Sequence, residues 1–403
     1  MKKLRAPAII AAAALVLAGC APDTEPAPAT SSEPGSTTSS AAAAPVAVGM
    51  ISSQTGPLAA YGEAYKAGFD AGLDYATDGT GTVDGRELEI KWIDDQGNPD
   101  TAVSQAKDII GQGYTIMAGT VSSGIAGPLA EQAAQNKVLY ISGPAAADAI
   151  TGINEYTFRS GRQTYQDVAT AGTFIGDPSG KKVVVFAQDN AFGQGNLAGV
   201  EAVLGGQGAE VQAVLVAEDA TEFTPFAQQL SDAKPDLIFV AWAGASSGAM
   251  WTSLEQQKVF DVAPVVTGLG DVSTYGAYGD ASGNISFLNH YFDGATDTDA
   301  AKAMKDYLEA EGKVVDLFSP DGFVAAQMIV QAVREGGDTV DGMIAALEDW
   351  TFDSVKGSIT VRASDHAMIQ PMFQVKLVDD GGNWKPELIE TVDAETVAPP
   401  AGE

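Results

Sequence analysis

Residues 46–77 read VAVGMISSQTGPLAAYGEAYKAGFDAGLDYAT, and this stretch decides the fold class. Its first six residues, 46–51, are apolar and rich in β-branched side chains, as expected of a strand that is covered on both faces. Gly56 and Pro57 then set a tight turn, and the residues from there to 77 predict an amphipathic helix. The stretch therefore predicts one strand and one helix with a polar loop between them.

The same alternation appears twice along the chain, from 46 to 141 and again from 182 to 267. Further strands are predicted at 88–94, 115–118, 138–141, 182–187, 210–216, 237–241 and 264–267. Further helices are predicted at 99–111, 127–135, 165–175, 193–204, 225–231, 248–257, 300–311, 322–334 and 340–348. Such alternation implies parallel sheets built from right-handed crossovers. We therefore predict an α/β fold with two doubly wound parallel-sheet lobes, which bind ligands beyond the carboxyl ends of their strands.

The charge balance and the scarcity of cysteine and histidine exclude several functions. The 403 residues include 22 Lys and Arg against 53 Asp and Glu, a formal net charge of −31. Such a surface repels nucleic acid, so we expect no polynucleotide partner. One cysteine and two histidines, His290 and His366, cannot assemble a zinc set or a disulfide. We interpret both histidines as incidental, and we expect no cofactor, no metal and no catalytic residue.

The first twenty residues resemble a bacterial lipoprotein signal peptide. A positive start is followed by a short apolar run at 8–17, which ends in Leu17-Ala18-Gly19-Cys20. The run is too short to span a bilayer. In a lipobox of this kind Cys20 is acylated and the chain is cut before it; the alternative is an ordinary signal peptide with a coincidental cysteine. Residues 21–45 are rich in Pro, Ser, Thr and Ala and predict a flexible stalk. We expect an extracytoplasmic protein, lipid-anchored to the bacterial cell membrane.

Polar residues follow the predicted strands of the first lobe. Asp94 and Asp95 are adjacent and therefore point in opposite directions, so a role in the turn is favoured over paired catalysis. Asn98 is predicted to cap the helix that follows. Ser122 and Ser123 stand at a helix start, where free N–H groups favour a carboxylate. The alternative is that one serine side chain caps that helix.

Six short stretches, taken together, resemble the type I periplasmic binding proteins, specifically the family that binds leucine, isoleucine, valine and similar solutes for ABC transporters. The stretches are Thr55-Gly56-Pro57…Tyr61-Gly62, Asp94-Asp95-Gln96-Gly97-Asn98-Pro99, Gly119…Ser122-Ser123, Ile141-Ser142-Gly143-Pro144, Phe158-Arg159 and Phe192-Gly193-Gln194-Gly195. None is specific alone, but their order matches the family and the resemblance covers residues 46–378. It implies two lobes, joined by three crossings, that close on a small-molecule ligand without catalysis.

The resemblance also implies boundaries and partners. The first lobe would comprise residues 46–163 and 291–350, and the second lobe 164–290 and 351–395. A member of this family delivers its solute to ABC permease and ATPase subunits, and we expect it to be a monomer.

The family's binding residues carry over in part. Ser123 matches the serine that binds the ligand carboxylate in amino-acid-binding members. Tyr61 matches an aromatic residue near the cleft mouth, Phe192 one at the ligand side chain, and Phe318 falls about where another ring lines the pocket; the alternative for all three rings is simple packing. The remaining predicted ligand-binding residues are Ser122, Pro144, Ala145, Arg162, Gln163, Tyr165, Trp242 and Asp271.

Two of these residues have a definite alternative role. Arg162 lies at the expected lobe crossing and suits a bidentate grip on a carboxylate, or it pairs with an acid across the hinge. Trp242 and Trp251 follow the strand 237–241, where an indole suits stacking on a flat or apolar solute, or burial in the second lobe.

Two residues that the family uses to hold an amino acid are missing. The clamping threonine is replaced by Ala145-Ala146-Ala147, and the glutamate that meets the ammonium group aligns with Leu269. Asp271 substitutes for it only if its loop shifts. An unpaired ammonium in a closed cleft is costly. We predict a small polar or amphipathic solute (amino acid, amide, urea or small carboxylic acid) that is not a plain branched-chain amino acid. The alternatives are a sensing module without import and a secreted α/β hydrolytic enzyme.

Overall fold

The computed structural model describes residues 44–401. Cys20 and most of the predicted stalk therefore lie outside the described residues. None of the described helices is both long enough and apolar enough to span a membrane.

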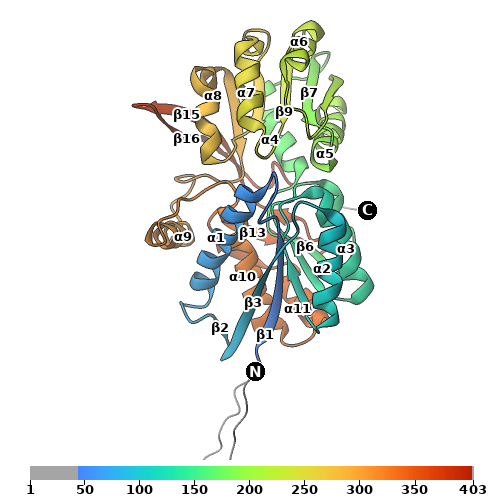
Figure 1. The fold of residues 1–403 in the computed structure, drawn as a ribbon, viewed down its shortest axis with the longest axis vertical. Coiled ribbons are helices and arrows are strands. Elements are labelled where there is room, and N and C mark those ends of the chain that lie inside the picture. Colours follow the sequence, from blue (N-terminus) through green and yellow to red (C-terminus); the bar gives the residue numbers. More distant parts are fainter. Residues whose placement is uncertain (1–43, 402–403) are drawn as a thin grey trace, which may run out of the picture. The chain divides into compact units, whose positions relative to one another are not determined.

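The first lobe is built on a six-stranded sheet with the order β2-β3-β1-β4-β5-β6 (Figure 1). Its strands are β1 Val46–Ser52, β2 Thr82–Val83, β3 Arg86–Asp94, β4 Ile116–Ala118, β5 Leu139–Ser142 and β6 Thr157–Arg159. All neighbours are parallel except β2 and β3. The helices of this lobe are α1 Ala59–Ala76, α2 Pro99–Gly111, α3 Ser123–Asn136, α10 Ser319–Gly336 and α11 Val340–Leu347.

The turn before α2 has the predicted chemistry. The side chain of Asn98 accepts a hydrogen bond from the Thr101 N–H at 2.9 Å, and Pro99 begins the helix. Asp95 is fully buried, and its two carboxylate oxygens accept from Ser53 Oγ at 2.7 Å and Thr120 Oγ1 at 2.5 Å. The predicted turn role of the two adjacent aspartates is confirmed, because Asp94 likewise accepts backbone and side-chain bonds from its neighbouring loop.

The second lobe is built on a seven-stranded sheet with the order β16-β15-β11-β10-β9-β7-β8. Its strands are β7 Lys182–Gln188, β8 Glu210–Val216, β9 Leu237–Ala241, β10 Val265–Gly268, β11 Ile285–Asn289, β15 Met372–Asp380 and β16 Asn383–Val392. The strands β7 to β11 are parallel, and β15 and β16 are antiparallel additions at one edge. The helices are α4 Thr164–Ile175, α5 Ala191–Val200, α6 Thr224–Ala233, α7 Ser247–Gln256 and α8 Tyr275–Tyr278, with short turns at Glu201–Gly205, Val259–Asp261, Val272–Thr274 and Gly279–Asn284. The short turn Asp148–Ile150 lies between β5 and β6 of the first sheet, and α9 Asp299–Ala310 packs against α1.

Alternate residues of β7 enter different cores. Val184 and Phe186 belong to one buried apolar cluster, whereas Val183 and Val185 belong to another. Successive side chains of a strand point to opposite faces of the sheet. The second sheet is therefore covered on both faces, which confirms the predicted doubly wound architecture.

A small three-stranded sheet follows α11. Its strands are β12 Thr351–Ser354, β13 Gly357–Val361 and β14 Met368–Ile369. Ile359, Val361 and Met368 join the apolar core of the first sheet. Residues 351–369 therefore pack with the first lobe, although the resemblance placed them in the second.

The chain passes between the two sheets three times, as expected. It leaves β6 for β7, returns from β11 to α10, and passes from β14 to β15. The predicted elements are all present with ends shifted by a few residues, but β2, β6, the strands β11 to β16 and the short helix α8 were not predicted.

Candidate ligand-binding site

A cavity of about 310 Å³ lies where the carboxyl ends of strands from both sheets meet. It is large enough for a small solute, because ligand pockets begin at roughly 300 Å³. Eight of the predicted residues line it: Tyr61, Ser122, Ser123, Pro144, Arg162, Phe192, Trp242 and Phe318.

Four predicted residues do not line the cavity: Ala145, Gln163, Tyr165 and Asp271. Ala145 is buried in a small apolar cluster beside α3. The side chain of Gln163 donates to Asp148 at 2.8 Å. The backbone of Tyr165 donates to the same carboxylate at 3.0 Å. These residues fix the start of α4 and do not meet the solute space.

Asp271 is held away from the cavity by its own loop. Its carboxylate accepts hydrogen bonds from Ser273 Oγ and from Thr274 Oγ1, and only 8% of the residue is exposed. Leu269, at the position aligned with the missing glutamate, does line the cavity. Asp271 is therefore engaged elsewhere and leaves Leu269 as the cavity wall.

Aromatic side chains form much of the apolar wall. Tyr61 meets Phe318 edge to face, with ring centroids 4.9 Å apart. Trp242 packs against Phe186 at 5.2 Å while its Nε1 donates to Ser246 Oγ at 3.0 Å. The wall can thus cover the apolar part of a solute. Trp251, the other indole considered, is buried in the second core and does not line the cavity.

The start of α3 forms part of the cavity wall, and among the described residues no side chain caps it. Ser122 is the N-cap residue, but its side chain makes no capping bond. Ser123 Oγ accepts from the Ala147 N–H at 3.2 Å, which leaves its proton available to a solute. The capping alternative is therefore wrong for these serines, because a loop 24 residues away occupies Ser123.

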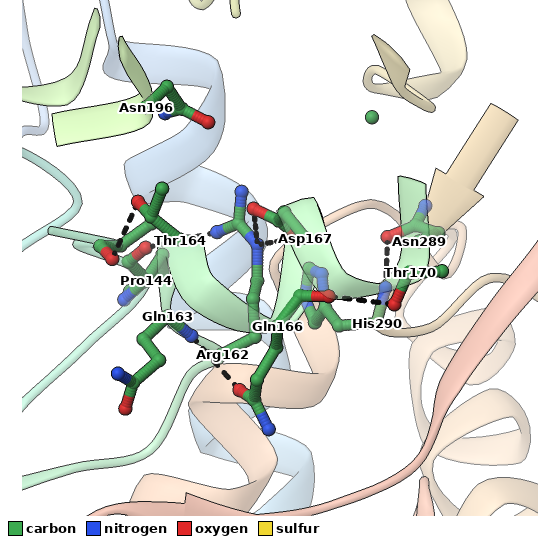
Figure 2. A network of polar contacts seen from close by, with 12 residues as sticks. Pro144, Arg162, Gln163, Thr164, Gln166, Asp167, Thr170, Asn196, Asn289 and His290 are labelled. Atoms are coloured by element: carbon green, nitrogen blue, oxygen red, sulfur yellow. Dashed lines mark hydrogen bonds and ion pairs between the residues drawn. The ribbon is translucent and has the colours of Figure 1, made fainter. Parts of the chain in front are cut away.

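Arg162 both lines the cavity and forms an ion pair. Its Nε lies 3.2 Å from Asp167 Oδ2, and its Nη1 donates to the Pro144 carbonyl at 3.3 Å. Figure 2 shows the guanidinium beside Asp167 on α4. Burial raises the pKa of Asp167, and the Arg162 charge opposes that rise. The acid that pairs with Arg162 is therefore Asp167, only five residues further along the chain. Asp167 also lines the cavity, although it was not predicted as a binding residue.

His290 is the residue whose interpretation changes most. It lines the cavity, is 1% exposed, and has its Nε2 3.3 Å from Asp321 Oδ2. Burial lowers the pKa of His290 to about 4, against the opposing effect of Asp321, so the ring is neutral at pH 7. The sequence interpretation of His290 as incidental did not anticipate this place in the cavity wall. His366, in contrast, contacts the Thr157 carbonyl at 2.9 Å, and it is not among the residues that line the cavity.

Four other polar residues of the cavity were not predicted from the sequence. Gln188 ends β7 and Asn289 ends β11, Asn190 caps α5, and Asn196 lies on α5. Their positions after strand ends were the available signal. Among the described residues, no cluster of three or more acidic, histidine or cysteine side chains suits a metal ion.

Comparison with known proteins identifies relatives over nearly the whole described chain. Residues 45–383 match the family model described as periplasmic binding protein. The Leu/Ile/Val-binding protein homolog 3 of Brucella melitensis is 27% identical over 349 residues, which cover 85% of this chain and 94% of that protein.

Two solved structures are also similar. An ABC-type branched-chain amino acid transporter from Rhodopseudomonas palustris is 30% identical, has a TM-score of 0.74, and matches over 88% of this chain and 99% of that one. A solute-binding protein from R. palustris, in complex with 4-hydroxybenzoate, has a TM-score of 0.78 at 22% identity, over 86% of this chain and 97% of that one. The second likeness concerns the fold alone.

Proposed function

This chain belongs to the periplasmic binding protein family, and from that premise we propose that it is the extracytoplasmic, lipid-anchored binding subunit of an ABC importer. As a family member it is a solute-binding protein and not an enzyme. The observation that carries the proposal is the cavity of about 310 Å³, which is lined by strand ends of both sheets. Closure of the lobes would capture the solute there, and permease and ATPase subunits would receive it from a monomer.

The core contacts support revised lobe boundaries. We place residues 46–163 and about 296–369 in the first lobe, because β12 to β14 share its core, α9 packs against α1, and Thr296 and Thr298 donate to carbonyls of the β12–β13 turn. The second lobe then takes residues 164–295 and 372–395, since Phe292 packs against Phe373 of β15 with ring centroids 6.2 Å apart. The hinge is the set of three passages between them.

The cavity wall favours a solute without an ammonium group. Leu269 and Ala146 line the wall at or near the positions where the family's glutamate and threonine would hold an amino acid. The lining acids are Asp167, which Arg162 already engages, and the exposed Glu218. Arg162 and Ser123 remain to hold an oxygen-rich end. The proposed solute class is therefore a small carboxylic acid, amide or urea with an apolar body.

A thermal-shift and calorimetry panel tests the function. The panel contains amino acids, amides, ureas and small carboxylic acids, and any solute that binds the folded protein raises its melting temperature by mass action. We expect a carboxylate or amide to bind and leucine, isoleucine and valine to bind roughly ten- to a hundredfold more weakly, because a charge-assisted partner for the ammonium is missing.

Two variants sharpen that panel. Leu269→Glu supplies the missing anion and is expected to strengthen leucine binding, whereas Leu269→Gln, its uncharged match, is not. Asp271→Ala should leave every affinity unchanged, since within the described part of the chain the Asp271 carboxylate bonds only to its own loop. Tight leucine binding that is lost in Asp271→Ala would contradict the solute class, and a panel without any hit would contradict the function.

The lipid anchor has a separate test. Cys20→Ser removes the chain's only thiol, which lies outside the described residues. We expect the variant to leave the membrane fraction and to keep its solute affinity, measured by fractionation and calorimetry. A variant that stays with the membrane would show that Cys20 is not the anchor.

A further inference from the structure

The ring of His290 forms an unusual part of the cavity wall. It follows β11 directly, is 1% exposed, and lines the cavity. Within residues 44–401 neither ring nitrogen makes a hydrogen bond of good geometry; Nε2 faces Asp321 Oδ2 at 3.3 Å. Nδ1 therefore lacks the partner that a polar atom of a buried side chain normally has, because an unmade bond leaves the full cost of desolvation.

The neighbours of His290 determine where its proton lies. Asp321 Oδ1 accepts from Lys356 Nζ at 2.6 Å. Burial alone would raise the pKa of Asp321, but His290 and Lys356 hold that pKa below its usual range, so the group is a carboxylate. A carboxylate only accepts hydrogen bonds, which places the proton of the neutral ring on Nε2. Nδ1 is then an acceptor without a partner in the described chain.

Arg162 is the neighbouring donor at the same end of the cavity. Its guanidinium carbon lies 5.7 Å from the Phe318 ring centroid, and the His290 ring lies 5.9 Å from the same centroid. Its Nη2 makes no hydrogen bond to the described residues, whereas Nε and Nη1 do. This end of the cavity therefore offers one cationic donor and one neutral acceptor.

We propose that Arg162 and His290 together recognise a carboxylic acid that carries an uncharged hydroxyl group. Arg162 donates to the carboxylate, and His290 Nδ1 accepts from the hydroxyl. An ammonium suits this place less well, because Arg162 and Lys356 repel it while Asp167 and Asp321 are already paired. A keto acid is also a poor fit, because its ketone oxygen has no hydrogen to donate and would place a lone pair against the lone pair of His290 Nδ1. The inference rests on the proposed function and narrows its solute class.

Matched acids test the inference on the unaltered protein. Calorimetry on the purified full chain compares 2-hydroxy-4-methylpentanoate with 4-methylpentanoate, 2-oxo-4-methylpentanoate and leucine, and 4-hydroxybenzoate with benzoate. The two skeletons set the hydroxyl at two distances from the carboxylate. In at least one of them the hydroxy acid is expected to bind about tenfold or more tightly than its counterparts, since those leave Nδ1 unpaired.

Three results would overturn the inference: the unsubstituted acid matching the hydroxy acid on both skeletons, leucine binding most tightly, or none of the six probes binding. The proposed function would survive each of them if the wider panel still gave a bound solute, so the two failures are distinguishable.

Two variants assign the preference to the ring. His290→Leu removes the acceptor and should abolish the difference between hydroxy acid and parent acid, while His290→Gln keeps an acceptor and should retain part of it. His366→Gln is the matched control, a second buried histidine that does not line the cavity, and should keep the full difference. An undiminished difference in a folded His290→Leu protein would also overturn the inference.

Discussion

Lys356 is buried to 1% exposure and is held by two partners. Its Nζ donates to Asp321 Oδ1 at 2.6 Å and to Gln370 Oε1 at 3.0 Å. Gln370 Nε2 in turn donates to Oε1 of Gln166 on α4 at 3.3 Å. His290 faces Asp321 at the other end of this series of polar contacts. The network therefore joins residues of all three passages between the lobes. A lysine is almost never buried so fully unless it is paired.

Breaking this pair should be costly, and removing both partners should be less so. Lys356→Met leaves Asp321 buried without its cation, which we expect to cost about 3–5 kcal/mol of unfolding free energy. The double variant Lys356→Met with Asp321→Asn removes the stranded charge and should recover part of that loss. Urea unfolding measures both values. A single variant within about 0.5 kcal/mol of the parent would contradict the importance of the pair.

Residues that act through short-range geometry were predictable, and residues placed by distant elements were not. Asn98 was predicted as a cap because its partner is three residues away. His290 was missed because β11, which positions it, is short and pairs with β10 and with β15, a strand more than 80 residues later. Ser123 was predicted to bind the solute, with a helix cap as the alternative, and the bond from the distant Ala147 N–H could not be read from the local pattern.

At the scale of elements, helices α1 and α10 pack unusually closely although about 250 residues separate them (Figure 1). A Cβ added at Gly68 would lie 1.8 Å from the Ser319 carbonyl oxygen, and one at Gly322 would lie 1.9 Å from the Tyr65 carbonyl oxygen. These obstacles are backbone atoms, which cannot rotate away. The two glycines therefore set the distance between the helices.

Gly68→Ala should separate the two helices and lower stability. Overpacking typically costs about 1–3 kcal/mol, and more where the backbone must move. Gly127→Ala is the matched control, because it also lies in a helix but a Cβ there meets nothing within 4 Å. That change is expected to be neutral or to stabilise by up to about 1 kcal/mol. Thermal unfolding followed by circular dichroism compares them, and equal melting temperatures would refute the packing argument.

Most parallel core strands were predictable because their apolar runs are local and continuous, as in β7 and β9; the parallel strands β6 and β11 were missed. The strands β12 to β16 were not predictable. β16 is largely exposed, with burial only at Val392, and so carries no apolar alternation. Its place is set by pairing with β15, which a local pattern does not contain. For the same reason, the lobe boundary near residue 350 could be placed only from the packing of β13 and β14 in the core of the first lobe.

At the scale of the whole folded unit, two loops from opposite lobes meet beside the cavity. Tyr61 Oη accepts a hydrogen bond from the Gly244 N–H at 3.1 Å, and the Pro57 carbonyl accepts from the Ala245 N–H at 3.2 Å. Gly244 has φ +82°, and a Cβ there would lie 2.9 Å from the Pro57 oxygen. Glycine is thus required for this approach. Because Tyr61 also lines the cavity, one side chain contacts both the solute space and the opposite lobe.

If this contact holds the closed form, weakening it should speed solute release more than it slows capture. Tyr61→Phe keeps the ring against Phe318 but removes the acceptor, and the loss of one hydrogen bond of about 1 kcal/mol corresponds to roughly fivefold faster release. Gly244→Ala should act more strongly, because the added Cβ opposes the approach of Pro57.

Stopped-flow binding of the tightest acid from the panel gives the release rate, and small-angle scattering at saturation gives the radius. The wild-type protein should contract with solute, and Gly244→Ala should contract less. Tyr165→Phe, in a tyrosine that does not line the cavity, should behave as wild type. Release rates and radii that are the same in all four proteins would mean that these loops touch without holding the lobes together.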